Sequence, residues 1–197
     1  FCFEFSRDVW HFSLWEQFWA SVFQTVTPRT AGFNTVDLTM LSEPTIFLMV
    51  LLMVTGGSPG STAGGYKTTT LATLLLCMRS VFRGQDHIQI FGRRFPQDVL
   101  RRSVSLFCLY LILFLCGGMV ISYIEEIPIL TAIFETGSAI GTVGLSLGIT
   151  PTLGRCSQLI LILLMFFGRV GGLTLIYAIS TPHSPAMAQL PQEKITI

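Results

Sequence analysis

Charged residues are scarce in this chain. Of its 197 residues only 12% are charged, whereas 51% are hydrophobic and the mean hydropathy is +0.65. A soluble domain of this length buries too little of its surface to hide so many apolar side chains. The composition therefore excludes an ordinary soluble protein and indicates an integral membrane protein.

The chain lacks the residues that several functional classes of protein would need. The net charge of +1, without a basic stretch interleaved with aromatic residues, excludes a nucleic-acid-binding protein. The five cysteines and three histidines show no metal-ligand spacing. A membrane enzyme would need a larger set of titratable groups than Glu135 and Arg169. The chain starts at Phe1 without a leader pattern, so we expect a fragment with no signal peptide.

One segment is long enough to cross a bilayer without interruption. Residues 104–124 contain no charge, and at about 1.5 Å per residue they cover about 30 Å. Half of the twelve Lys and Arg residues lie just before it, namely Arg79, Arg83, Arg93, Arg94, Arg101 and Arg102. The positive-inside rule makes this basic loop cytoplasmic. Glu125 and Glu126 follow the span, and this end is expected outside.

Two apolar segments are too short to be ordinary spans. Residues 10–26 and 127–140 each cover half to two thirds of a span, and each leads into a glycine turn. Irregular backbone at this depth must line a water-filled cavity. The pattern therefore predicts two re-entrant pore helices. Asp37 and Glu43 follow the first turn, where they either enrich cations at an outer mouth or belong to a solvated loop.

Two further apolar segments are interrupted by glycines. Residues 45–55 predict a helix that stops at a glycine-rich loop over residues 56–65 and resumes over residues 67–81. This pattern is typical of a helix that is broken inside the bilayer. Residues 158–179 predict the last span, and a polar tail follows.

The two glycine turns belong to a repeat with a spacing of 112 residues. The first copy contains Phe23, Gln24 and Thr25, followed by Thr30, Ala31, Gly32, Phe33 and Asn34. The second copy contains Phe134, Glu135 and Thr136, followed by Thr142, Val143, Gly144, Leu145 and Ser146. A Thr-x-Gly turn after a half-length helix can aim carbonyl oxygens along a pore and replace the water around a potassium ion. Glycine supplies the positive φ that this needs; the alternative is that each glycine only closes a loop.

The order of these segments resembles the Trk/Ktr/HKT superfamily of potassium transporters. Three stretches carry the resemblance: residues 30–35 (TAGFNT), 57–70 (GSPGSTAGGYKTTT) and 141–146 (GTVGLS). The resemblance covers about residues 10–195, and Lys67 with the following threonines looks more like the KtrB branch than the TrkH branch.

The resemblance implies an all-α membrane fold with helix–pore helix–helix repeats, in which four units surround one pore. The expected divisions are a third unit without its first helix (residues 1–82), a basic cytoplasmic loop (83–103), a fourth unit (104–180) and a cytoplasmic tail (181–197). Without the first two units these residues alone cannot close a four-sided pore.

The resemblance also implies a selectivity filter made of backbone carbonyls. The expected K+ ligands are the carbonyls of Thr30, Ala31, Gly32, Thr142, Val143 and Gly144, flanked by Phe33, Asn34, Leu145 and Ser146. Both copies lack the second glycine of the Thr-Val-Gly-Tyr-Gly filter of potassium channels. This difference suggests fewer coordination sites and weaker selectivity.

In the similar transporters, the glycine-rich loop is an intramembrane gate below the filter. The expected gate residues are Gly56, Gly57, Ser58, Gly60, Ser61, Thr62, Gly64, Gly65, Lys67 and, on the last helix, Arg169. A phosphate-binding P-loop is excluded because Tyr66 separates Gly65 from Lys67. A packing break in a tilted helix is the alternative for the loop, and pairing with a structural carboxylate such as Glu135 is the alternative for Arg169. Gly172 stands where many relatives have proline.

The function implied is that of a translocation subunit for potassium uptake in the cytoplasmic membrane, with Na+ dependence left open. No enzymatic activity and no cofactor are expected beyond the transported K+ or Na+. The implied partners are a second copy of the subunit and a cytoplasmic ring of nucleotide-binding regulatory subunits similar to KtrA or TrkA. The alternatives are a non-conducting structural or assembly subunit and a Na+-permeable channel of the same fold.

Overall fold

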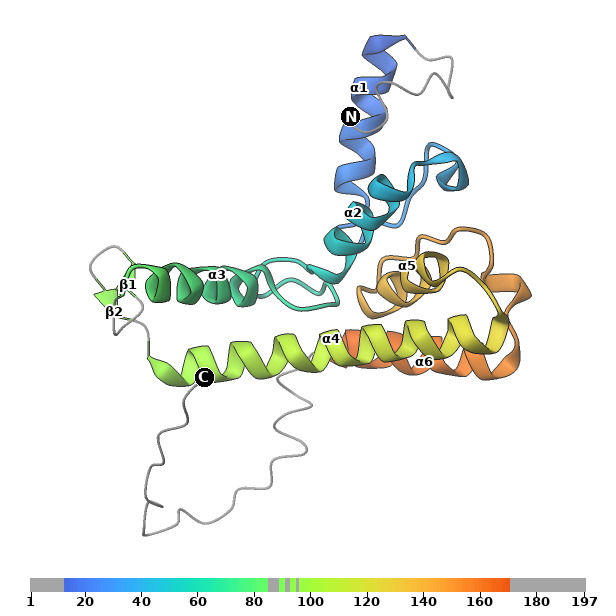
Figure 1. Ribbon diagram of the computed structural model, residues 1–197. Coiled ribbons are helices and arrows are strands. Elements are labelled where there is room, and N and C mark those ends of the chain that lie inside the picture. The colour runs from blue at the N-terminus through green and yellow to red at the C-terminus, as the bar shows by residue number, and fades with distance from the viewer. Residues whose placement is uncertain (1–12, 85–88, 91–92, 95, 171–197) are drawn as a thin grey trace.

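The computed structural model describes residues 13–84, 89–90, 93–94 and 96–170 (Figure 1). Its helices are α1 (Leu14–Val26), α2 (Glu43–Val54), α3 (Thr68–Phe82), α4 (Gln97–Glu125), α5 (Ile129–Ile140) and α6 (Arg155–Val170), with short 3-10 turns at Leu38–Met40 and Thr150–Thr152. β1 (Gln89–Ile90) and β2 (Arg93–Arg94) form a small antiparallel hairpin in the basic loop. Apart from this hairpin, the all-α prediction is confirmed.

α4 is the one described helix that is long and apolar enough to cross a membrane, over Asp98–Glu125. α2, α3 and α5 are apolar but shorter, as the predicted interruptions require. The sequence placed the start of the span at residue 104, whereas α4 begins at Gln97. Hydropathy marks where the apolar run begins, and the helix continues beyond it through Arg101 and Arg102.

Local sequence signals explain where several helices begin and end. At the start of α1, Ser13 and Glu16 form a capping box, in which Glu16 Oε2 accepts from Ser13 N at 2.8 Å. α4 ends at Glu125, the next residue Glu126 has a left-handed φ of 55°, and Pro128 precedes the first residue of α5. This short connection reverses the chain and lays α5 against α4 (Figure 1).

α5 lies at the centre of the fold. It packs against α2, α4 and α6, and every residue from 134 to 141 is buried. Phe134 and Ile140 are fully covered, and Met53 of α2 and Ile121 of α4 complete the core around them. A helix of 12 residues that is enclosed on this scale cannot be a surface helix or a complete span. This position fits the predicted re-entrant pore helix.

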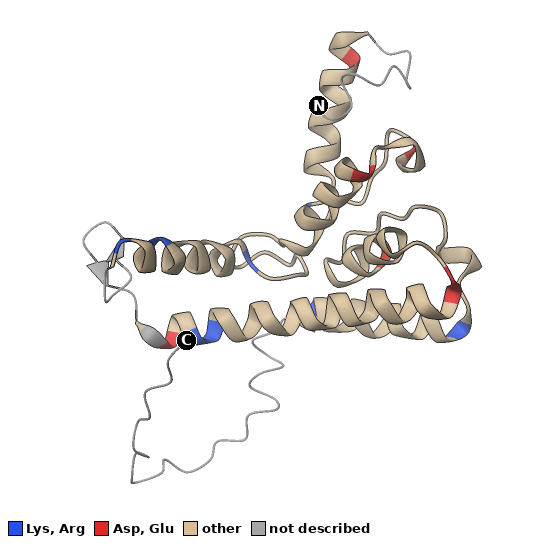
Figure 2. Cartoon of the chain, in the orientation of Figure 1, with Lys and Arg blue, Asp and Glu red and all other residues tan. Residues whose placement is uncertain are grey.

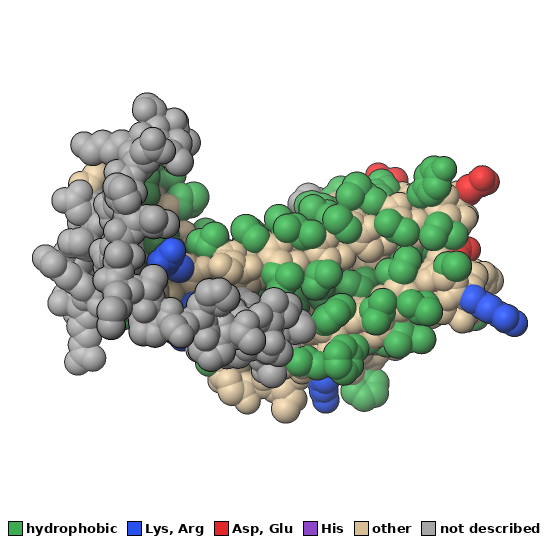
Figure 3. Space-filling view, turned by 90° about the horizontal axis from the view of Figure 1, so that it is seen from below, with side chains coloured by type: hydrophobic (Ala, Val, Ile, Leu, Met, Phe, Trp, Pro, Cys, Tyr) green, Lys and Arg blue, Asp and Glu red, His purple; other side chains and the backbone are tan. Residues whose placement is uncertain are grey.

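The charged side chains lie mainly at the two ends of α4. Arg79 and Arg83 at the end of α3 lie near the start of α4, which carries Arg101 and Arg102 (Figure 2). Glu125 and Glu126 occupy the opposite end of α4. Between these ends, Figure 3 shows many hydrophobic side chains on the molecular surface. The exposed hydrophobic residues of these helices include Ile112 and Met119 of α4 and Ile162 and Phe166 of α6.

Three predictions fall outside the described residues. They are the start of the first pore helix before residue 13, the end of the last span with Gly172, and the tail of residues 181–197.

Candidate functional site

The two predicted glycine turns have the same unusual backbone. Thr30 and Gly32 have φ of 66° and 73°, and Thr142 and Gly144 have φ of 53° and 91°. A positive φ is uncommon for any residue with a Cβ and strained for a β-branched one, so its occurrence at both threonines marks a shared design. The sequence predicted positive φ at the glycines but not at the threonines. In both turns, two residues of positive φ flank one whose φ is not positive.

Each turn is built onto the last turn of its helix. After α1, the N–H groups of Ala31 and Gly32 both donate to the carbonyl of Thr27, at 3.1 and 3.3 Å. After α5, Val143 N donates to the carbonyl of Ser138 at 2.9 Å. The helix end therefore fixes the start of each turn.

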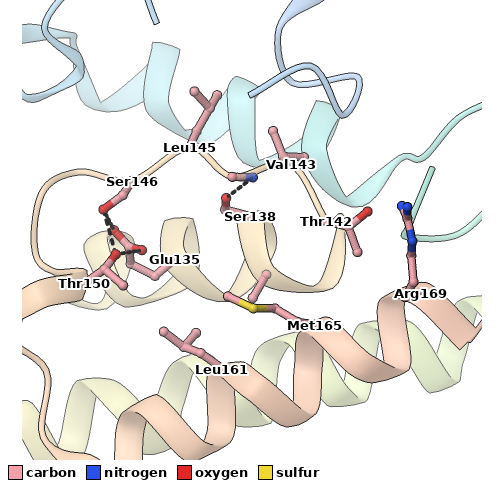
Figure 4. Close-up of a pocket in the computed structure, with 12 residues that line it drawn as sticks. Glu135, Ser138, Thr142, Val143, Leu145, Ser146, Thr150, Leu161, Met165 and Arg169 are labelled. Atoms are coloured by element: carbon pink, nitrogen blue, oxygen red, sulfur yellow. Dashed lines mark hydrogen bonds between the residues drawn. The ribbon is translucent and has the colours of Figure 1, made fainter. Parts of the chain in front are cut away.

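Equivalent hydroxyl groups hold the two turns. Thr27 Oγ1 donates to the carbonyl of Phe33 at 2.5 Å. Ser138, 111 positions after Thr27, accepts a hydrogen bond from Gly144 N at 3.2 Å, drawn in Figure 4. Both hydroxyls thus bind the backbone at or next to a turn glycine.

A second pair of equivalent side chains connects α1 and α5 to the chain beyond their turns. Gln24 Nε2 donates to Asn34 Oδ1 at 3.1 Å. Glu135, also 111 positions later, accepts from Ser146 Oγ at 2.6 Å. The repeat contained these four residues, but the sequence gave no sign that they are partners, because ten or eleven positions separate the members of each pair.

The two turns lie against each other. A Cβ built on Gly32 would overlap the carbonyl oxygen of Val143, whereas one on Gly144 would meet no atom within 4 Å. Gly32 is therefore required by contact as well as by its positive φ, and Gly144 by φ alone. The structure brings the two predicted filter segments together in this way.

The glycine-rich loop closes against the base of the second turn. Gly65 N donates to the carbonyl of Ile140 at 3.0 Å, and Gly64 N donates to Thr142 Oγ1 at 3.1 Å. The two ends of the loop are joined by hydrogen bonds, because Gly56 N donates to the carbonyl of Tyr66 at 2.8 Å. The interruption predicted from the sequence is thus a loop between α2 and α3 that is hydrogen-bonded to the second turn.

Two cationic side chains bind three consecutive carbonyls of this loop. Lys67 Nζ donates to the carbonyls of Ser61 and Ala63 at 2.9 and 2.7 Å. The Arg169 guanidinium of α6 donates to the carbonyl of Thr62 at 3.0 Å. Figure 4 shows Arg169 pointing from α6 toward this loop. In the described residues Arg169 therefore binds the loop and not Glu135, whose partners lie in the segment after Gly144.

A cavity of about 420 Å³ lies between α5, the second turn and α6. Residues 142–146 form one wall, and Leu161 and Met165 of α6 form another (Figure 4). Glu135 and Arg169 supply the charged groups of its lining. The cavity therefore gives the backbone of the second turn an open side.

One carboxylate lies in the loop between the first turn and α2. Asp37 accepts hydrogen bonds from the hydroxyl and the N–H of Thr39, and these bonds lower the pKa of its carboxyl. Because the pKa is lowered, Asp37 keeps its negative charge to a lower pH than an ordinary aspartate.

The family described as TrkH, cation transport protein, matches residues 6–189. The chain belongs to the TrkH family. The resemblance to Trk and Ktr proteins read from the sequence is therefore confirmed. This is a family of membrane transporters and not of enzymes.

Named relatives agree with this assignment. The chain is 41% identical over 181 residues to potassium/sodium uptake protein NtpJ of Enterococcus hirae, covering 89% of this chain and 40% of that protein. It is 38% identical over 168 residues to Ktr system potassium uptake protein B of Bacillus subtilis, covering 85% and 38%. The chain thus spans about 40% of the length of these TrkH-family relatives.

The fold agrees with a solved structure of the family. The potassium transporter TrkH from Vibrio parahaemolyticus matches with a TM-score of 0.72 and 24% identity, over 92% of this chain and 40% of that one. The predicted membrane-protein fold is confirmed by this likeness.

Proposed function

We propose that this chain is the C-terminal half of a pore subunit that takes up K+ across the cytoplasmic membrane. The observation that carries the proposal is the pair of adjoining turns, each with the same left-handed threonine and glycine at the end of a half-length helix. Residues 1–82 then form a third pore unit without its first helix, and residues 104–180 a fourth unit.

In this proposal the turns form two sides of the filter. A dehydrated K+ is held by backbone carbonyls of Thr30, Ala31, Gly32, Thr142, Val143 and Gly144. Asn34 and Ser146 hold the turns in place through their contacts with Gln24 and Glu135. Beside them, the carbonyl of Phe33 accepts a hydrogen bond from Thr27, and Leu145 is buried.

The glycine-rich loop is the gate in this proposal. Its members are Gly56, Gly57, Ser58, Gly60, Ser61, Thr62, Gly64 and Gly65, and Lys67 and Arg169 hold it closed. Carbonyls that are bound by these two cations cannot coordinate a passing K+, and the positive charges oppose its approach. Opening must therefore break the bonds of the loop to both side chains and to Thr142.

Sodium permeation is the second candidate function. It is favoured by the printed name of NtpJ, a potassium/sodium uptake protein, and by the missing second filter glycine in both turns. Uptake measured separately with K+ and with Na+ distinguishes the two.

The partners form part of the proposal. The arginines at the start of α4 and the end of α3 support a cytoplasmic position for this end under the positive-inside rule. The basic loop of residues 83–103 and the tail offer a docking surface for a ring of nucleotide-binding regulatory subunits, and the pore subunit forms a homodimer. Support comes from the named Ktr systems among the relatives, and the ring itself is an analogy.

The test is growth of a bacterium without potassium uptake systems at limiting K+. The full-length protein should restore growth, and Gly144→Asp should abolish it while the protein is still made and inserted. Thr152→Asp is the control, because Thr152 is exposed and lies in the short turn before α6, outside the proposed filter, gate and docking surface. Loss of growth with both variants, or with neither, contradicts the filter assignment.

A further inference from the structure

A buried carboxylate lies behind the second turn and has no part in the pathway described so far. Glu135 of α5 is 4% exposed. It accepts from Ser146 Oγ at Oε1, at 2.6 Å, and from Thr150 Oγ1 at Oε2, at 2.8 Å (Figure 4). Its Oε1 also accepts from Leu147 N at 3.0 Å. All three donors belong to the segment that follows Gly144.

These bonds form a closed network. Ser146 Oγ and Thr150 Oγ1 also lie 2.9 Å apart, and Gly148 N donates to Ser146 Oγ at 2.9 Å. Hydrogen bonds to a charged acceptor are stronger than those between neutral groups. One side chain of α5 thereby binds three residues of the segment 146–150 directly and a fourth, Gly148, through Ser146.

The other turn has a weaker version of the same contact. Gln24 of α1 is also buried, and its amide makes one side-chain bond, to Asn34 Oδ1. Its Oε1 has no partner within the part of the chain that the structure describes. Asn34 and Ser146 both stand two positions after the turn glycine. The two turns of the proposed filter are therefore held differently. The neutral Gln24 makes one hydrogen bond beyond the first turn, whereas the acidic Glu135 makes three beyond the second.

Support of this kind matters because Gly144 lacks close packing where a Cβ would lie. A Cβ at Gly144 would meet no atom within 4 Å, so hydrogen bonds must hold this part of the backbone. Its N–H is held by Ser138, and the chain beyond it by Glu135. Selecting one dehydrated ion over a smaller one depends on the number and placement of the carbonyls.

We propose that Glu135 is the positioning residue that sets ion selectivity in the second turn, by holding residues 146–150 and with them the carbonyls of Val143 and Gly144. This inference rests on the proposed function. The carboxylate also adds a negative charge to the lining of the cavity beside the turn, which favours a cation there.

The experiment measures uptake of K+ and Na+ by the full-length protein in vesicles, with rates divided by the amount of inserted protein. Glu135→Gln keeps the size and removes the charged acceptor. We expect the ratio of K+ to Na+ uptake to fall about tenfold and the apparent KM for K+ to rise, with a smaller change in maximal rate. Ser146→Ala should also lower the K+ to Na+ ratio. Ser146→Thr keeps the hydroxyl and should leave the ratio as in the unmodified protein.

A matched control separates positioning from stability. Glu125 is also a carboxylate that accepts hydrogen bonds, from Gly154 N and Ser157 Oγ, but it holds the start of α6 and not the turn. Glu125→Gln should lower the amount of protein without changing the K+ to Na+ ratio. The double variant Glu135→Gln with Ser146→Ala should have the same K+ to Na+ ratio as Glu135→Gln alone, because both substitutions disrupt the same Glu135–Ser146 interaction.

The outcomes are distinct for the two proposals. If Glu135→Gln keeps the ratio within twofold of the unmodified protein while Gly144→Asp abolishes uptake, the role of Glu135 is wrong and the proposed function stands. If Glu125→Gln changes the ratio as much as Glu135→Gln, the effect is structural and the inference also fails. If the unmodified protein takes up neither ion, both proposals fail.

Discussion

The hydroxyl of Thr142 accepts a hydrogen bond from the backbone N–H of Gly64, with 3.1 Å between Gly64 N and Thr142 Oγ1. The two residues are 78 positions apart and lie in the second turn and the glycine-rich loop. Thr142 is strained by its positive φ, so its neighbours must keep it in this conformation. A direct hydrogen bond therefore joins the filter to the gate in the proposed pathway.

Thr142→Val removes this acceptor and should loosen the loop. The loss of one hydrogen bond of about 1 kcal/mol predicts a basal uptake rate several times higher. Thr142→Ser keeps the hydroxyl and should behave like the unmodified protein. Rates of K+ uptake in vesicles, per inserted molecule, check this prediction. Equal basal K+ uptake by Thr142→Val and Thr142→Ser would show that the hydrogen bond to Gly64 does not control the loop.

Alanine should be tolerated less well at Gly32 than at Gly144. Both substitutions force a left-handed conformation, at about 1–2 kcal/mol. Only the Cβ at position 32 would also overlap the carbonyl of Val143. We expect Gly32→Ala to lower the melting temperature of the purified protein more than Gly144→Ala. The reverse order would mean that the two turns do not lie against each other.

Neutralising Lys67 or Arg169 should favour the open gate. Lys67→Met and Arg169→Gln each free backbone carbonyls of the loop, which then become available to cations. Basal K+ uptake should rise in each variant. Because the bound carbonyls are adjacent, the two effects should not add in the double variant. Arg155→Gln, at the other end of α6, is the control; a similar rise there would point to a general effect of charge.

Gly168→Ala should destabilise the fold without a specific effect on selectivity. A Cβ at this position of α6 would overlap the carbonyl oxygen of Ile140, at the end of α5. Overpacking a close contact costs about 1–3 kcal/mol. Less inserted protein with an unchanged K+ to Na+ ratio per molecule is expected. Unchanged abundance and melting temperature would argue against this close approach of α6 to α5.

The sequence predicted the elements better than their contacts. The apolar run in α4 and the short apolar segment of α5 are visible in hydropathy, and the repeat marks Gly32 and Gly144. The start of α4 was placed seven residues late, because helical geometry extends past the apolar run into charged residues.

The hydrogen bond from Arg169 to the carbonyl of Thr62 could not be predicted from a sequence pattern. It spans 107 positions, and the acceptor is a backbone carbonyl, which any residue type supplies. From the sequence, the opposite charges of Glu135 and Arg169 suggest an ion pair as one alternative for Arg169. The structure instead gives Glu135 three local donors, which satisfy a buried carboxylate without a cation.

Uptake by the full-length protein in vesicles shows whether the paired turns select K+. K+ and Na+ uptake would be compared for the unmodified protein, Gly32→Ser and Gly144→Ser, at equal amounts of inserted protein. We expect the unmodified protein to prefer K+ and both variants to lose most of this preference. Preference that persists in both variants would contradict this expectation.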